Sequence, residues 1–274
     1  MTKRADAFRK LHQSGCFVMP NPWDAGSAWM LARLGFPAVA TTSAGFAWSM
    51  GRPDNGVSVD EALQHMRAIA QAVDVPVNAD FEGAFAVEPD AVAKNVALAA
   101  ATGVAGLSVE DSTGNAESPL FDFDLSVARI AAARRAIDRT GTGVLLTGRS
   151  EGFVVGRPDL EETIRRLKAY GEAGAECLYA PRINDLSALA RIVDAVAPRP
   201  VNALVGSDFA TVAQVAETGA RRISVGGTLA RAAWAGFLEA ANEIAERGTF
   251  TAFARAVPFA DLDGAFPARG RRSE

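Results

Sequence analysis

Residues 75–111 read VPVNADFEGAFAVEPDAVAKNVALAAATGVAGLSVED and contain a strand, a helix and a second strand. The short apolar runs over 75–80 and 106–110 predict two strands that are buried on both faces. Between them, Asp90 is typical of a helix start, and Gly103 supplies the matching stop. The segment therefore predicts one complete strand–helix–strand unit.

This unit recurs about eight times along the chain. The apolar runs that predict strands cover residues 17–19, 38–42, 75–80, 106–110, 144–148, 177–180, 201–204 and 222–225. Ser58 and Glu61 form a capping box before one helix, Asp124 and Asp159 resemble further helix starts, and glycines 35, 103, 141, 174 and 219 supply stops. Eight units within 274 residues predict an α/β fold, a (β/α)8 TIM barrel, in preference to a doubly wound sheet of about six strands.

The domain organisation follows from the same pattern. Few linkers or charge runs interrupt it, so we predict a single barrel domain over 1–274, with a C-terminal helical extension over 228–262. The extension is rich in alanine and leucine, which fits packing on a neighbouring subunit as well as packing on its own barrel. The tail over 268–274 is predicted to be disordered.

Composition excludes several classes of partner. Hydrophobic residues make up 49% of the chain and charged residues 22%, as in a soluble globular domain. The net charge of -4 gives no field that favours nucleic acid or anionic lipid. No apolar run approaches the roughly 20 residues that span a bilayer, and the N-terminus lacks the apolar region of a signal peptide. We expect a cytoplasmic protein that binds neither nucleic acid nor membrane, with Cys16 and Cys177 as buried, reduced thiols.

In a barrel of this kind the chemistry lies at the carboxyl ends of the strands. Strand three ends in Asp80 and Glu82, which period-two alternation places on the same side, and strand four ends in Glu110 and Asp111. Neighbouring carboxylates repel one another unless a cation lies between them, and a set of oxygen ligands suits Mg²⁺. The pattern predicts a metal site; helix caps or surface charge are the alternative, which explains Asp111 best.

Two further strand ends suggest binding of a carboxylate. Arg149 ends strand five, where a guanidinium can hold a carboxylate bidentately; the alternative is an arginine paired only with Glu151 or Glu110. After strand two, residues 42–46 read TSAGF, and the N–H groups of such small residues can approach a carboxylate or phosphate closely. A tight turn is the alternative for this segment.

The remaining strand ends are less specific. Tyr179 ends strand six and offers a phenol as a proton donor, or an aromatic ring of the barrel core. Residues 202–206 and the glycine pair 226–227 end strands seven and eight, where many barrels hold a phosphate and where a simple turn is the alternative. All four lysines and both histidines fall in predicted helices or at the N-terminus, which disfavours a Schiff-base amine, a histidine base and a zinc site.

A family resemblance emerges from five stretches taken together. They are PNPWDA at 20–25, SMGRPD at 49–54, Asp80-x-Glu82, VED at 109–111 and GR at 148–149. In this combination and order, from about residue 17 to Ala230, the chain resembles the isocitrate lyase and phosphoenolpyruvate mutase superfamily. The resemblance implies a (β/α)8 barrel that binds Mg²⁺, or Mn²⁺ in its place, and an α-oxocarboxylate or its enolate. It also implies a homo-oligomer, a tetramer or a dimer, in which the last helix packs onto a neighbour.

The resemblance assigns expected roles to individual residues of this sequence. The resemblance implies that Asp80, Glu82 and Glu110 hold the metal, with Glu82 replacing an aspartate of the family. It further implies that Arg149 faces the enolate and Asp54 lies near the metal. The expected substrate contacts are Ser43, Ala44, Gly45, Asp54, Arg149 and Asn202. The expected catalytic residues are Arg149, Glu110 and Tyr179.

The loop after strand four departs from the family. Carbon–carbon lyases of the family carry Lys-x-Cys-Gly-His there, whereas residues 111–120 read DSTGNAESPL. The general acid is therefore unassigned, and its candidates are Tyr179 and the loop over 112–118, in which Glu117 or Ser118 could substitute. The glutamate that cleaving members often carry after strand six is replaced by Pro181 and Arg182. The leading hypothesis is a Mg²⁺-dependent carbon–carbon lyase that acts on a 2-oxo or 2-hydroxy carboxylate through an enolate. The alternatives are an oxaloacetate decarboxylase, a carbon–phosphorus enzyme acting on phosphonopyruvate, and a non-catalytic binder of 2-oxo acids.

Overall fold

The computed structural model describes residues 1–266. The chain divides into two compact units, Met1–Leu229 and Ala230–Glu274, and each is described by itself. The predicted disordered tail, 268–274, lies outside the described residues.

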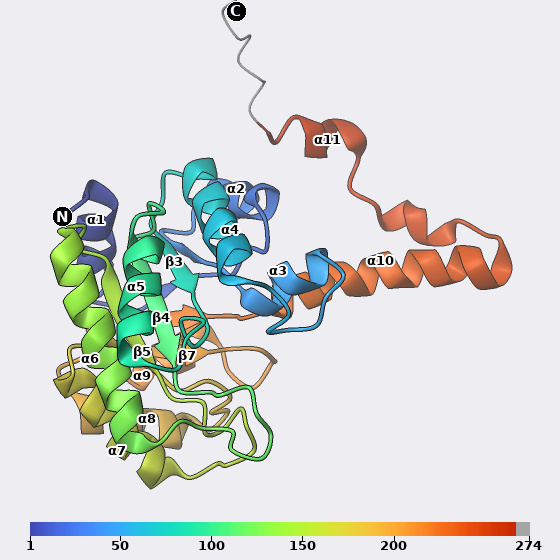
Figure 1. The fold of residues 1–274 in the computed structure, drawn as a ribbon. Coiled ribbons are helices and arrows are strands. Elements are labelled where there is room, and N and C mark those ends of the chain that lie inside the picture. Colours follow the sequence, from blue (N-terminus) through green and yellow to red (C-terminus); the bar gives the residue numbers. More distant parts are fainter. Residues whose placement is uncertain (267–274) are drawn as a thin grey trace, which may run out of the picture. The chain divides into compact units, whose positions relative to one another are not determined.

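The first unit is built on eight parallel strands in a curled sheet (Figure 1). The strands are β1 (Phe17–Val18), β2 (Val39–Ala40), β3 (Val77–Asp80), β4 (Gly106–Glu110), β5 (Leu145–Arg149), β6 (Cys177–Tyr179), β7 (Val201–Leu204) and β8 (Arg222–Ser224). Their order is β1-β8-β7-β6-β5-β4-β3-β2, and the Ala40 N–H donates to the Pro20 carbonyl at 3.0 Å, which links β2 to the segment after β1. All eight predicted strands and the TIM-barrel fold class are confirmed.

One helix precedes β1, and helices separate each strand from the next along the chain. They are α1 (Lys3–Leu11), α2 (Ala25–Arg33), α3 (Ser43–Ser49), α4 (Val59–Ala72), α5 (Pro89–Ala100), α6 (Phe123–Thr140), α7 (Leu160–Glu172), α8 (Leu186–Val196) and α9 (Val212–Glu217). Neighbouring helices such as α5 and α6 pack side by side on the outside of the sheet (Figure 1). This alternation places the carboxyl end of every strand at one end of the barrel.

Most of the predicted helix limits are observed. Ser58 and Glu61 form the capping box of α4, and Asp159 caps α7. Two starts are corrected. Asp122 caps α6, because its carboxylate accepts the N–H groups of residues 124 and 125. Helix α5 begins at Pro89, whose fixed φ favours a first helical position, so Asp90 lies inside the first turn. The five predicted stop glycines all have positive φ, as helix ends of this type require.

Helix α1 closes the amino-terminal end of the barrel. Phe8 packs there on Met19, Leu145 and Cys177 in a small buried cluster. A Cβ atom at Gly106 would lie 2.6 Å from Phe8 Cε1 and 2.6 Å from Asn78 Oδ1, so this position of β4 requires glycine. Cys177 is buried, Cys16 is half-buried, and both are free thiols.

The C-terminal extension is helical, as predicted. It contains α10 (Thr228–Arg247), a 3-10 turn (Thr251–Arg255) and α11 (Phe259–Asp263). Within the second unit, the Glu243 carboxylate accepts the N–H groups of Thr251 at 2.8 Å and Ala252 at 2.7 Å, which ties the 3-10 turn to α10. Among residues 1–266, no helix is long and apolar enough to cross a membrane.

Candidate active site

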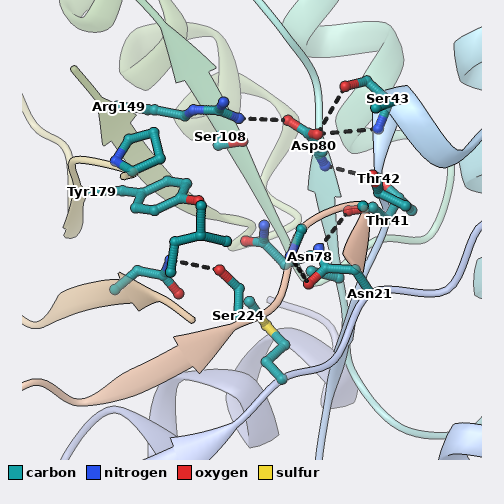
Figure 2. A pocket seen from close by; sticks show the side chains of 18 of the residues that line it. Asn21, Thr41, Thr42, Ser43, Asn78, Asp80, Ser108, Arg149, Tyr179 and Ser224 are labelled. Atoms are coloured by element: carbon teal, nitrogen blue, oxygen red, sulfur yellow. Dashed lines mark hydrogen bonds and ion pairs between the residues drawn. The ribbon is translucent and has the colours of Figure 1, made fainter. Parts of the chain in front are cut away.

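A cavity of about 180 Å³ opens at the carboxyl ends of the strands (Figure 2). Its lining comes from the ends of all eight strands and from the loops that follow them. The side chains that face it are mostly polar, whereas bulky apolar residues usually fill the interior of a barrel, so this cavity is the candidate site.

Arg149 connects the carboxylates of three neighbouring strand ends. Its Nη1 atom lies 3.0 Å from Asp80 Oδ1 and 3.2 Å from Glu110 Oε2, and its Nε atom donates to Glu151. Burial alone would lower the pKa of Arg149, but the charges of Glu110, Glu151 and Asp80 outweigh it and raise the pKa well above its ordinary value. The arginine is therefore paired with Glu110 and Glu151, as the alternative interpretation held, and with Asp80 as well.

Helix α3 fixes the other oxygen of Asp80. The Ser43 N–H and hydroxyl donate to Asp80 Oδ2 at 3.1 Å and 3.0 Å, and the Asp80 N–H donates to Thr41 Oγ1 at 2.8 Å (Figure 2). Gly45 donates its N–H to Thr42 Oγ1 at 3.3 Å, which caps α3. Ala44 lines the cavity. The predicted small-residue segment is thus the first turn of a helix, and the N–H groups of Ser43 and Gly45 are engaged within the protein.

Glu82 lies beyond the end of β3. The strand ends at Asp80, and Glu82 has a φ of 48°, so the period-two alternation used to place both side chains does not extend to it. Glu82 lines a second cavity, of about 520 Å³, together with Glu110, Asn55 and the loop after β4. Burial and the charges of Asp80 and Asp54 raise the pKa of Glu82 to about 8. Its Oε1 atom is buried and has no hydrogen-bond partner.

The carboxylates fit a hard divalent cation in charge and in chemistry. Burial raises the pKa of Glu110 and of Glu151 despite the nearby Arg149, and burial and Asp80 raise the pKa of Asp54. The site thus holds more acidic groups than one guanidinium balances, and they are all oxygen donors, as Mg²⁺ prefers. In the part of the chain that the structure describes, no three acidic, histidine or cysteine side chains are placed so that they could hold a metal ion. The fit is therefore one of charge and donor type, not of ligand geometry.

Tyr179 and Asn202 line the other side of the cavity. The Arg149 guanidinium carbon lies 5.2 Å from the centre of the Tyr179 ring. Burial raises the pKa of Tyr179 to about 12, so the phenol stays protonated at neutral pH. Asn202 donates from Nδ2 to Ser224 Oγ at 2.9 Å and is 1% exposed.

The loop after β4 is ordered by its two ends. Ser112 and Leu120 form an antiparallel bridge, and the preceding Asp111 is buried. Asp111 accepts from Tyr170 Oη at 2.6 Å and from the Glu151 N–H at 2.7 Å, so it serves neither as a helix cap nor as surface charge. Glu117 and Ser118 are exposed and lie outside the lining of both cavities.

Sequence reasoning missed several polar groups of the cavity, among them two that lie deep in it. Asn78, in β3, and Arg222, at the start of β8, both line it and are buried. The sequence does contain a sign of Arg222, because a charged residue is unusual in an otherwise apolar strand. Arg222 stands two positions before Ser224, so both side chains face the same side of the strand. The rule that chemistry lies at the carboxyl ends of strands does not select Arg222, because it begins its strand.

The chain is similar to proteins of known family. A family model described as phosphoenolpyruvate phosphomutase matches residues 8–245. An uncharacterised protein of Mycobacterium tuberculosis is 32% identical over 258 residues, which cover 93% of this chain and 94% of that protein. The 2-methylisocitrate lyase of Escherichia coli is 30% identical over 181 residues, 63% of this chain and 60% of that enzyme.

A solved structure matches over nearly the whole chain. It belongs to a Burkholderia cenocepacia protein that is provisionally assigned as a lyase or mutase. The two share 46% sequence identity and superpose with a TM-score of 0.94, covering 97% of this chain and 96% of that one.

Proposed function

Because the chain belongs to the phosphoenolpyruvate phosphomutase family, we propose that it is a Mg²⁺-dependent lyase that breaks a carbon–carbon bond of a 2-oxo or 2-hydroxy carboxylate. The membership confirms the resemblance that the five sequence stretches predicted, and it places the chain in a superfamily of lyases and mutases. The observation that carries the proposal is the Arg149 guanidinium held by Asp80, Glu110 and Glu151 at the strand ends.

Asp80, Glu82 and Glu110 are the proposed holders of Mg²⁺, or of Mn²⁺ in its place. When bound there, the ion supplies a Lewis acid that polarises the oxygens of the substrate's oxo-acid end. The unpartnered Glu82 Oε1 atom and the surplus of buried carboxyl groups support this assignment. Ser43, Ala44, Asp54 and Asn202, which line the cavity, are the proposed substrate contacts around it. Gly45 was expected among them, but it does not line the cavity and its N–H caps α3.

The chain's own residues complete the reaction. A carboxylate of the site takes the hydroxyl proton of the departing fragment, whose carbon becomes a carbonyl group as the carbon–carbon bond breaks. The electron pair of that bond stays with the oxo-acid fragment as an enolate. Arg149 compensates the developing negative charge from a fixed position, because Glu110 and Glu151 hold its guanidinium. Tyr179 then donates its phenolic proton to the enolate carbon, a role that its retained proton supports.

Decarboxylation of oxaloacetate is a second candidate. Loss of CO₂ needs the same enolate stabilisation and no general base. It is favoured by the position of Glu117 and Ser118, which are exposed and line neither cavity.

A substrate panel tests the proposal. Oxaloacetate, isocitrate, 2-methylisocitrate, 2,3-dimethylmalate and phosphonopyruvate are offered with Mg²⁺ and after chelation, and 2-oxo acid, glyoxylate and phosphate are measured. We expect turnover of a carbon–carbon substrate that is lost on chelation and in Glu110→Gln, but kept in Glu161→Gln, which changes an exposed glutamate of α7. Turnover of phosphonopyruvate alone would contradict the carbon–carbon assignment, and turnover of oxaloacetate alone would establish the decarboxylase.

We also propose a cytoplasmic homo-oligomer, a dimer or a tetramer, in which the extension over 228–262 packs onto a neighbouring subunit. The support for assembly is the set of large apolar side chains that the second unit leaves exposed, among them Trp234, Phe237 and Leu238.

A further inference from the structure

Arg222 lies inside the barrel, below the carboxylates of the site. It begins β8, and its side chain is among the largest that are fully buried, at 1% exposure. Its Nη2 atom donates to Thr147 Oγ1 of β5 at 2.9 Å, and its Nε atom donates to Asn202 Oδ1 of β7 at 2.9 Å. Its Nη1 atom lies 3.3 Å from His12 Nε2, at the end of α1. The guanidinium therefore spans the interior from β8 to β5.

None of these three partners carries a negative charge. Thr147 and Asn202 are neutral, and burial lowers the pKa of His12 to about 3, so its ring is neutral too. Across residues 1–266, no carboxylate forms an ion pair with Arg222. Among the other arginines, Arg149 and Arg166 pair with carboxylates. Arg129 is equally buried and, within residues 1–266, likewise forms no ion pair with a carboxylate, but it donates to backbone carbonyls. Arg222 contacts only neutral side chains.

A buried, unpaired guanidinium is costly, because the charge has left water without gaining a counter-charge. Arginine has five N–H groups, and the three contacts above engage one on each nitrogen, which leaves two for a ligand. Arg222 also lines the cavity that holds Arg149 and Asp80, so a ligand in the cavity reaches it. Thr147, which Arg222 contacts, stands two residues before Arg149 in β5, about 7 Å along the strand.

We propose that Arg222 is a second anion site, on the floor of the cavity, which binds the distal carboxylate of a short 2-oxo or 2-hydroxy dicarboxylate. The inference rests on the proposed function, which places the oxo-acid end of the substrate beside Asp80 and Arg149. Asn78 also lines the cavity and is 4% exposed, but its unpartnered Oδ1 atom only accepts hydrogen bonds, so it would face a hydroxyl group of the ligand and not the distal carboxylate. A site for a second carboxylate restricts the proposed substrates to dicarboxylates.

The test compares ligands that differ only in the distal group. Calorimetry in the presence of Mg²⁺ measures the Kd of 2-oxoglutarate against 2-oxopentanoate, and of oxaloacetate against 2-oxobutyrate. In each pair, a carboxylate replaces a methyl group. We expect the wild type to bind the dianion of at least one pair about tenfold to a hundredfold more tightly. In Arg222→Gln this ratio falls to about one, while the Kd of the monoanion and of oxalate stays unchanged.

Arg182 provides a matched control. It also lines the cavity and carries the same charge, but it is exposed. Arg182→Gln is expected to keep the preference for the dianion. Equal affinities within both pairs in the wild type, an unchanged ratio in Arg222→Gln, or loss of the ratio in Arg182→Gln instead would each overturn the proposal.

Two further measurements test the role of Arg222. If Arg222→Gln fails to fold, Arg222→Lys, which keeps the charge but loses the planar fork, is expected to show a reduced ratio. In crystals of the wild type, the distal carboxylate of 2-oxoglutarate is expected at Arg222. A bromide ion bound there without any preference for dianions would mean that the site takes an inorganic ion only, and would overturn the proposal.

Oxalate separates this inference from the proposed function, because it occupies the oxo-acid end alone. If oxalate binds with Mg²⁺ and dianions have no advantage, only the role of Arg222 fails. If neither oxalate nor any 2-oxo acid binds, the proposed function fails.

Discussion

Arg149 is the residue on which the proposed catalysis depends most, because it contacts three carboxylates and also lines the cavity. Arg149→Lys keeps a positive charge but loses the planar fork that contacts several oxygens. We expect kcat to fall about 100-fold to 1000-fold, as for the loss of a fixed donor to a developing oxyanion. The control is Arg165→Lys, in an exposed ion pair with Glu162 on α7, which should leave kcat unchanged. Equal kcat values in both variants would remove Arg149 from the mechanism.

His12 makes the stability of the fold depend on pH. In the unfolded chain its imidazole binds a proton below about pH 6.5, whereas burial and the nearby Arg222 lower its pKa in the folded protein to about 3. Between these pH values the unfolded chain binds more protons, so the free energy of unfolding falls as the pH falls. Between about pH 7 and about pH 4.5, the free energy of unfolding of His12→Gln should fall by about 2 to 3 kcal/mol less than that of the wild type. Urea unfolding at both pH values checks this, and the same fall in variant and wild type would contradict it.

Asp80, Glu110 and Arg149 could be selected from sequence because each ends a strand. Arg222 could not be selected by that rule, because it begins a strand and acts through a long side chain that reaches into the interior. Glu82 was assigned to the site, but its position depends on a left-handed turn that strand periodicity does not encode.

Among the strands, β4 shows how closely the interior of the barrel is packed. A Cβ atom at Gly106 would lie 2.6 Å from both Phe8 Cε1 and Asn78 Oδ1, so Gly106→Ala overpacks the barrel. We expect a loss of about 1 to 3 kcal/mol of stability, measured by urea unfolding. Gly236→Ala is the matched control, since no atom lies within 4 Å of the added Cβ atom in α10, and alanine is the better helix former. Destabilisation by the control but not by Gly106→Ala would contradict this account of the packing.

The order and type of the elements could be predicted because apolar runs and glycine stops repeat with a constant period. Helix starts were harder to predict, because several acidic residues often stand close together and only one accepts the N–H groups of the first turn. Asp122 does so in α6, two positions before the predicted Asp124. The first turn of α3 was predicted only as a substrate-gripping loop or a tight turn, because its capping bond between Thr42 and Gly45 depends on the backbone geometry after β2.

Across the molecule, exposed large apolar side chains are most numerous in the second unit. They include Trp234, Phe237, Leu238, Phe250, Phe253, Val257, Phe259 and Leu262. A soluble protein rarely leaves so many exposed, so we expect them to be covered in a homo-oligomer. Light scattering should give a mass of two or four times 28.7 kDa. Phe237→Glu should shift it toward the monomer, whereas Glu246→Lys, at an exposed polar position of α10, should not. A monomeric wild type would contradict the proposed assembly.

The central claim is that the site stabilises an enolate, and proton exchange at pyruvate tests it without knowledge of the full substrate. NMR measures how fast the methyl protons of pyruvate exchange with D₂O in the presence of the protein, because each exchange passes through the enolate. We predict exchange well above the rate in buffer with Mg²⁺, lost on chelation and in Arg149→Lys. Pyruvate that binds to the Mg²⁺-loaded protein but exchanges no faster than in buffer would contradict the account.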